Sequence, residues 1–130
     1  MKKIGIFISI ATVLLISCSK DVVKNDRLHG KWQLTEYYMD PGDGSGTWQP
    51  AHERLSVEFT KSGQFIQYTG NGNDTTNFTL LSDSTLQINT SNASSFLPYR
   101  FELKDNNATL FLYPPCIEGC GYKYTAIHKD

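Results

Sequence analysis

Apolar and polar residues alternate with a period of two along most of the chain. Residues 55–60 read Leu-Ser-Val-Glu-Phe-Thr, residues 86–89 read Leu-Gln-Ile-Asn, and residues 99–104 read Tyr-Arg-Phe-Glu-Leu-Lys. Because successive side chains of a strand point to opposite faces, this order predicts strands with one face buried and one in water. No segment shows a convincing helical repeat. The sequence therefore predicts an all-β protein.

Short clusters of Gly, Asn, Asp and Ser separate the alternating segments, as turns between strands require. They lie at 62–63, 71–72, 83–84 and 105–107, and the longest early connection, at 40–50, is rich in glycine. The pattern predicts eight strands, at 28–39, 54–60, 64–69, 76–82, 84–90, 98–104, 108–113 and 121–128. Eight antiparallel strands in succession form either a closed barrel or a sandwich, and periodicity does not choose between them.

The first strand changes its own alternation midway. Trp32 and Leu34 share one face, and Tyr37 and Met39 then continue as the apolar set. An extra residue in the strand near Thr35 or position 36 would account for the change, so the sequence predicts a β-bulge there.

The N-terminal segment has a different composition. Lys2 and Lys3 precede an uncharged apolar run at 4–16, which is shorter than the ~20 residues of a membrane span and fits a secretory signal peptide. The run ends in Leu-Ile-Ser-Cys at 15–18, which resembles the lipobox of bacterial lipoproteins. The resemblance implies that residues 1–17 are removed and that Cys18 is acylated. The alternative is an ordinary secretory signal that happens to contain a cysteine.

The lipobox has consequences for the rest of the chain. Residues 18–26 become a lipidated cysteine and its tether, and residues 27–130 become a single domain. Ser19 stands where an aspartate would favour retention in the inner membrane, so the sorting rule of such lipoproteins implies the outer membrane. Several acyl chains on one residue hold a protein firmly at a membrane, where a single chain would not.

Cys116 and Cys120 are the two cysteines that remain. In an oxidising compartment such a pair is most simply a disulfide. Residues four apart on a straight strand lie about 13 Å apart, beyond the ~4.4–6.8 Å between the Cα atoms of a disulfide. The chain must turn between them, and the neighbouring prolines and glycines permit this. A redox centre more often has two intervening residues, and a metal site needs further ligands, so the sequence predicts a disulfide that closes a turn.

The net charge and the length of the chain limit the classes of protein to which it can belong. Without Lys2 and Lys3 the chain keeps ten basic residues against 13 acidic ones, so its net charge falls to about −3. No basic cluster is present, which argues against nucleic acid as a partner. The 113 residues from Cys18 onward suffice for one domain.

The first strand also carries the tripeptide Gly30-Lys31-Trp32, which resembles the Gly-x-Trp signature of the lipocalins and their calycin relatives. Together with the ending PPCIEGCGYKYTAI, it makes the domain similar to short lipocalin-like lipoproteins of Gram-negative bacteria. The resemblance implies an eight-stranded up-and-down barrel whose closed end is plugged by the tryptophan. The chain departs from the family in its short length, in lacking a helix, and in having lysines where a late arginine is usual.

The aromatic residues suggest what the interior contains. From the alternation we expect these side chains to face inward: Trp32, Phe59, Ile66, Tyr68, Phe78, Leu80, Ile88, Tyr99, Phe101 and Tyr124. They either fill the core completely or leave an apolar pocket at the open end, where tyrosine hydroxyls would orient a ligand. For a pocket we expect Tyr68, Tyr99, Tyr124 and Phe101 as lining residues. Trp48, in the 40–50 connection, is interpreted as a lid or a contact for a partner.

Signs of catalysis or metal binding are poor. His29, His52 and His128 lie far apart without further ligands at suitable spacing, and Glu53 and Glu58 would point to opposite faces of a strand. The sequence therefore predicts no enzyme, no metal and no cofactor.

Two short motifs suggest a modification. Asp-Thr-Thr at 74–76 and Asp-Ser-Thr at 83–85 resemble sites of bacterial protein O-glycosylation, which would place sugars on Thr75 and Ser84. These residue types are also common in turns for their own local hydrogen bonds.

The sequence as a whole predicts an envelope lipoprotein, anchored in the outer membrane, that binds a small hydrophobic or amphipathic ligand in a barrel. The alternative is a protein–protein interaction or inhibitor module of the envelope that uses the 40–50 connection. An enzyme ranks third.

Overall fold

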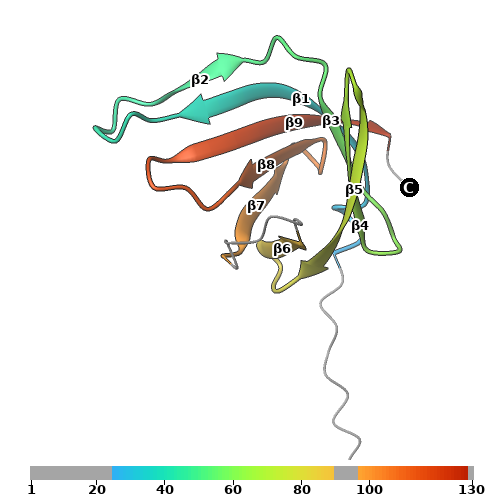
Figure 1. The fold of residues 1–130 in the computed structure, drawn as a ribbon. Coiled ribbons are helices and arrows are strands. Elements are labelled where there is room, and N and C mark those ends of the chain that lie inside the picture. The colour runs from blue at the N-terminus through green and yellow to red at the C-terminus, as the bar shows by residue number, and fades with distance from the viewer. Residues whose placement is uncertain (1–24, 90–96, 129–130) are drawn as a thin grey trace, which may run out of the picture.

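The chain forms a closed antiparallel barrel of eight strands with one short extra strand, as a computed structural model shows (Figure 1). The structure describes residues 25–89 and 97–128, so the predicted signal peptide and Cys18 lie outside the described residues. The strands are β1 (Gly30–Met39), β2 (Thr47–Pro50), β3 (Ser56–Phe59), β4 (Gln64–Thr69), β5 (Gly72–Leu80), β6 (Thr85–Asn89), β7 (Tyr99–Lys104), β8 (Thr109–Tyr113) and β9 (Cys120–His128).

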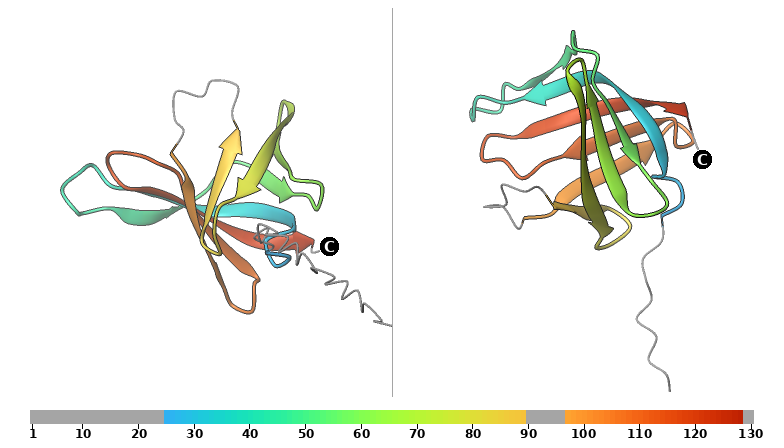
Figure 2. Two further views of the ribbon diagram at one scale, coloured as in Figure 1. Left: turned by 90° about the horizontal axis from the view of Figure 1, so that it is seen from below. Right: turned by 45° about the vertical axis from the view of Figure 1, so that its right-hand side comes forward.

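The barrel closes because β1 and β9, the first and last strands, pair with each other. From β3 to β9 each strand pairs with the next in sequence, β1 pairs with β3, and β9 returns to pair with β1 (Figure 2). This is the up-and-down barrel, and the sandwich is excluded. Closure leaves few open sheet edges. The pairing of β6 with β7 is the shortest, with Thr85 opposite Arg100 and Leu86 opposite Tyr99.

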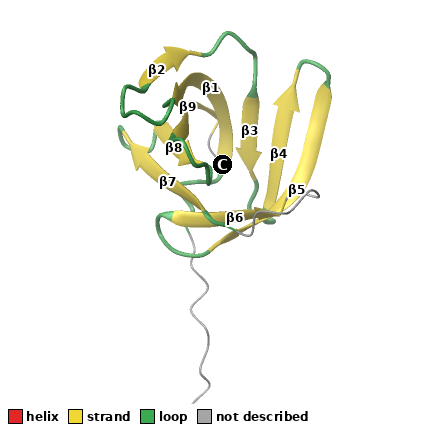
Figure 3. Ribbon diagram, turned by 60° about the vertical axis from the view of Figure 1, so that its left-hand side comes forward, coloured by secondary structure: helices red, strands yellow, loops and turns green. Residues whose placement is uncertain are grey.

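The described residues contain strands, turns and loops but no helix (Figure 3). Within those same ranges no helical segment is long and apolar enough to cross a membrane. The β7–β8 turn was predicted at 105–107, and Asp105, Asn106 and Asn107 there adopt left-handed φ angles of 54°, 54° and 65°. Asp and Asn tolerate this region better than other non-glycine residues.

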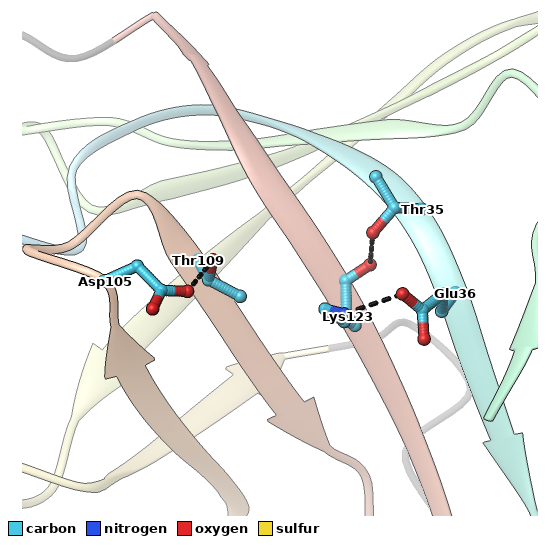
Figure 4. A network of polar contacts seen from close by, with 5 residues as sticks. All are labelled: Thr35, Glu36, Asp105, Thr109 and Lys123. Carbon is cyan, nitrogen blue, oxygen red and sulfur yellow. Dashed lines mark hydrogen bonds and ion pairs between the residues drawn. The ribbon is translucent and has the colours of Figure 1, made fainter. Parts of the chain in front are cut away.

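The predicted bulge in β1 is confirmed. The register between β1 and β9 shifts between Leu34 and Glu36, which leaves Thr35 as the extra residue. The Thr35 hydroxyl donates a hydrogen bond to the Lys123 carbonyl at 3.0 Å, and the Lys123 ammonium donates to the Glu36 carboxylate at 2.6 Å (Figure 4). These contacts stabilise the bend in β1. Because of that bend, the strand pairs with two different neighbours along one of its edges.

Those two neighbours are β3 and β2. The first part of β1 pairs with β3, while residues 36–39 pair with β2 beyond the barrel rim. The prediction of a loop throughout 40–50 was therefore wrong for residues 47–50. A strand of four residues with mostly exposed side chains has no alternating pattern by which to be recognised.

One end of the barrel is packed solid, and we call it the closed end. Six large side chains there have exposed fractions below 2%: Trp32, Phe59, Leu28, Leu86, Leu110 and Val57. The Phe59 ring contacts those of Phe65 and Phe78 at centroid distances of 5.1 and 5.0 Å. Burial of each large apolar side chain contributes roughly 1.5–3 kcal/mol, so this end stabilises the fold.

The inward face of β4 differs from the prediction. Register with β3 sets Phe65 opposite the inward Phe59, whereas Ile66 lies opposite the outward Glu58. Phe65 is buried and Ile66 only partly so. Phe65 and Gln67 therefore face the interior, and the expectation that Ile66 and Tyr68 do so was wrong. In a segment with apolar residues at 65, 66 and 68, alternation supports neither face strongly.

Candidate functional site

The open half of the barrel contains a cavity of about 190 Å³. Its walls come from the connection before β3 and from every barrel strand except β5, so it lies within the barrel. The lining residues are Leu34, Leu55, Val57, Phe65, Gln67, Ile88, Tyr99, Leu112, Tyr122 and Tyr124. Several of these also belong to the buried core, so the floor of the cavity is the packed closed end.

A second hollow of about 310 Å³ adjoins the cavity, and we call it the vestibule. It shares Leu34, Leu55 and Tyr122 with the cavity and adds Tyr37, Ala51, His52 and Glu53. Ligand pockets usually measure about 300–1,000 Å³. The inner cavity alone is below that range, and the vestibule brings the site within it.

Three tyrosines line the cavity. Tyr122 and Tyr124 stand two residues apart on β9, so they share a face, and their ring centroids are 6.3 Å apart. Tyr99 comes from β7. The exposed fraction is 4% for Tyr124 and 38% for Tyr122, so the first lies deep and the second lies at the boundary with the vestibule.

Burial keeps the phenols of Tyr124 and Tyr99 protonated. It is the main cause that raises the pKa of Tyr124, and the possible negative charges of Tyr122 and Tyr99 add to the effect. The pKa of Tyr99 is raised in the same way, first by burial and then by Tyr122. The hydroxyls therefore remain hydrogen-bond donors at and well above neutral pH.

The polar groups of the deep cavity lack protein partners. Among the described residues, neither the Tyr124 hydroxyl nor the Gln67 side-chain amide makes a hydrogen bond. Most buried polar groups do have a partner, because leaving one unpaired costs about 1–3 kcal/mol. An unpaired hydroxyl on a tyrosine that is only 4% exposed is the kind of group that a ligand or water would satisfy.

The four residues expected to contact a ligand are not all brought together. Tyr99 and Tyr124 line the cavity, but Phe101 is 2% exposed within the packed core and is not among the lining residues. Tyr68 lies on the outer surface, where its hydroxyl donates to Glu58 at 2.6 Å and the Lys31 ammonium lies 3.8 Å from its ring centroid.

Of the polar lining residues, Tyr122 and Gln67 were not predicted from the sequence. Tyr122 was recoverable, since a residue two positions from the inward Tyr124 shares its face. Gln67 was not, because a polar residue inside a barrel breaks the alternation on which the prediction depends.

Trp48 is neither a lid nor a free loop residue. It lies on β2 opposite Tyr38, and its ring centroid is 5.5 Å from that of Tyr38 and 5.5 Å from that of Phe111 on β8. To reach β8, the indole crosses Gly121 of β9, where an added Cβ would stand 3.2 Å from it. Trp48 therefore packs against the outer face of the barrel.

The predicted disulfide between Cys116 and Cys120 is present, with Cα atoms 6.2 Å apart. It closes the β8–β9 turn, and this turn contacts the end of β1 through a hydrogen bond from the Asp40 amide to the Gly119 carbonyl at 3.1 Å. The Asp40 carboxylate accepts hydrogen bonds from three glycine amides in the following loop. That of Gly42 contributes most to lowering the pKa of Asp40.

The remaining candidate residues are scattered. His29 lies 3.9 Å from Asp26 near the closed end, His52 lines the vestibule, and His128 ends β9. In residues 25–89 and 97–128 no three His, Cys, Asp or Glu side chains cluster as metal ligands would. Thr75 lies within β5 and not in the predicted turn, while Ser84 does lie in the turn before β6.

No family model matches the chain, and no curated protein matches it.

Proposed function

We propose that this protein is a lipocalin-like lipoprotein of the outer membrane that binds a small hydrophobic or amphipathic ligand in the open half of its barrel. The observation that supports the proposal most is the contrast between the two halves of the interior. Trp32 and its neighbours fill the closed end, whereas the cavity stays open among Tyr99, Tyr122 and Tyr124.

The lining chemistry suits such a ligand. Leucine, valine, isoleucine and phenylalanine side chains form most of the wall, and a few polar groups from tyrosine and glutamine interrupt it. Apolar walls with a small number of placed polar groups are usual in sites for small molecules. A barrel of about eight strands has the width to enclose one such molecule.

The direction in which the barrel opens suits a ligand carrier that is anchored to a membrane through its N-terminus. The chain enters the barrel at its closed end, where the Leu28 amide donates to the Asn25 carbonyl at 3.1 Å and the Leu28 side chain is fully buried with Trp32. Under the proposal, the tether from Cys18 to residue 26 attaches at this end. The open mouth would then face away from the membrane, toward ligands in solution or on partner proteins.

An amide chemical-shift titration of the ¹⁵N-labelled domain with toluene and with palmitate tests the proposal. We expect at least one of the two compounds to cause saturable shifts centred on Gln67, Tyr99 and Tyr124, with none in the 116–120 turn. If neither compound moves these cavity resonances, the ligand-binding function is refuted.

A second function, docking to another envelope protein, is favoured by the far tip of the β1–β9 pair. Ile117 is fully exposed, and Met39 is 67% exposed beside a hollow of about 560 Å³ at the disulfide-closed turn. Asp40 and Glu118 also line this hollow. An apolar tip with acidic neighbours suits a partner that has an apolar pocket with basic residues around it.

Chemical cross-linking in solubilised envelopes separates this function from carriage of a small molecule. Ile117→Asp should abolish a specific cross-linked species, while Ile127→Asp, at a 56% exposed position near the closed end, should retain it. Equal yields for the two variants would contradict docking through the tip.

A further inference from the structure

We infer that the ligand inserts a compact, uncharged part, about the size of one substituted ring and carrying a hydrogen-bond acceptor, which the Tyr124 hydroxyl binds. The inference rests on the proposed function and specifies its ligand. It excludes a long acyl chain, and it excludes a charged group in the inner cavity.

The charge of the inserted part follows from the lining. None of the described residues around the inner cavity is Asp, Glu, Lys, Arg or His. Burying an unpaired charge in an apolar site carries a large desolvation penalty. A carboxylate or ammonium group would have no opposite charge to meet there, so the inserted part must be neutral.

The size of the inserted part follows from the volume of the inner cavity and from the packed residues that form its floor. An apolar protein cavity of about 150 Å³ accommodates benzene, and the cavity here measures about 190 Å³. Below it, Val57, Phe59 and Trp32 are at most 1% exposed, so no channel continues to the closed end. One ring with a short substituent fits this space, whereas an extended acyl chain would need a deeper barrel.

The polar requirement follows from the two unsatisfied groups. The Tyr124 side chain is only 4% exposed, and its burial keeps the hydroxyl protonated. The hydroxyl makes no hydrogen bond among the described residues, and it is not one of their fully buried unpaired atoms, so it keeps contact with the space of the cavity. A ligand hydroxyl, ether or carbonyl oxygen would accept a hydrogen bond from it, and the Gln67 amide, on β4, adds a second donor or acceptor to the lining. A purely apolar ring would leave both groups unpaired.

The vestibule sets where the rest of the ligand lies. It carries His52 and Glu53, both exposed, at its outer side. A polar or charged substituent that extends outward would stay in contact with water there. The ligand is then amphipathic, with its neutral ring inward and any charge at the mouth.

Four probes test this inference by calorimetric titration at neutral pH: 4-ethylphenol, ethylbenzene, 4-ethylbenzoate and palmitate. We expect 4-ethylphenol to bind about ten times more tightly than ethylbenzene, and the two charged probes to bind more weakly than 4-ethylphenol. Tyr124→Phe should reduce the preference for 4-ethylphenol, because this probe loses its hydrogen bond while ethylbenzene no longer leaves the Tyr124 hydroxyl unpaired. Tyr68→Phe, which removes a hydroxyl on the outer face, is the matched control and should behave as wild type.

The outcomes separate the inference from the proposed function. If palmitate or 4-ethylbenzoate binds as tightly as 4-ethylphenol, or if Tyr124→Phe keeps the preference, the ligand class is wrong while the carrier function stands. If no probe binds the wild-type protein, both are wrong. A thermal melt of each variant establishes that it is folded before the titration.

Discussion

The indole N–H of Trp32 donates a hydrogen bond to the main-chain carbonyl of Leu28 at 2.9 Å. This bond links the residue that plugs the closed end to the turn through which the chain enters the barrel. Both side chains have no exposed surface. The closed end is thus a packed unit that forms the floor of the cavity.

Trp32→Phe should destabilise the domain by about 2–4 kcal/mol, because it leaves a void and an unpaired buried carbonyl. The free energy of unfolding in urea, followed by far-ultraviolet circular dichroism, measures this loss. Trp48→Phe is the matched control, because Trp48 is only half-buried on the outer face. A loss for Trp32→Phe no larger than that of the control would show that the closed end does not stabilise the fold as argued.

Gly121→Ala should cost about 1–3 kcal/mol by overpacking the outer face. A Cβ there would stand 3.1 Å from two ring carbons of Tyr113 and 3.2 Å from Trp48. Gly70→Ala, where no atom lies within 4 Å of the added carbon, should be neutral or slightly stabilising. Thermal denaturation of both variants tests the contrast, and equal melting temperatures would rule out the packing of Trp48 over Gly121.

Alkaline pH should weaken the fold through Tyr124. Burial raises its pKa above the ordinary value of about 10, so the unfolded chain loses the proton at lower pH than the folded one. The resulting stability is complete below about pH 10 and is lost as the pH rises from there toward the folded pKa. For each proton by which the folded and unfolded states differ, the free energy of unfolding changes by about 1.4 kcal/mol per pH unit.

Tyr124→Phe isolates this contribution. The variant should show a shallower decline in unfolding free energy than wild type between about pH 10 and 11, in urea titrations at fixed pH steps. Tyr113→Phe, on the outer face of β8, supplies the comparison for a tyrosine outside the cavity. Parallel declines for wild type and Tyr124→Phe would mean that the hydroxyl is not desolvated.

Reduction of the Cys116–Cys120 disulfide should lower stability by about 2 kcal/mol, because the loop that it closes is short. The disulfide lies at the tip beyond the rim, so the barrel itself should persist. Urea unfolding with and without a phosphine reductant measures the loss, and amide spectra show whether the core is retained. Complete unfolding on reduction would contradict this division between tip and barrel.

Alternation located the eight barrel strands because one buried face imposes a period of two on each of them. It failed where a strand has no buried face. The start of β5, residues 72–75, is exposed and reads Gly-Asn-Asp-Thr, so the strand was predicted to begin only at 76. β2 was missed for the same reason. Such segments form by backbone pairing with a neighbouring strand. The pattern of their side chains gives no sign of this pairing.

The site was only partly predictable. Tyr99 and Tyr124 were found because aromatic residues at inward positions follow the alternation. Tyr68 was misplaced because an outward tyrosine that packs under Lys31 looks as apolar in sequence as an inward one. Whether aromatic side chains fill a barrel or leave space depends on their combined packing, and the cavity volume therefore emerges only in three dimensions.

The central claim is that the open half of this barrel holds a ligand beside the Tyr124 hydroxyl. Crystals grown with 4-ethylphenol test it most directly. Difference density should show the ring among Tyr99, Tyr122 and Tyr124, with its oxygen within hydrogen-bond distance of Tyr124. Density for protein side chains in that volume, or for the compound only at other places on the molecule, would contradict the claim.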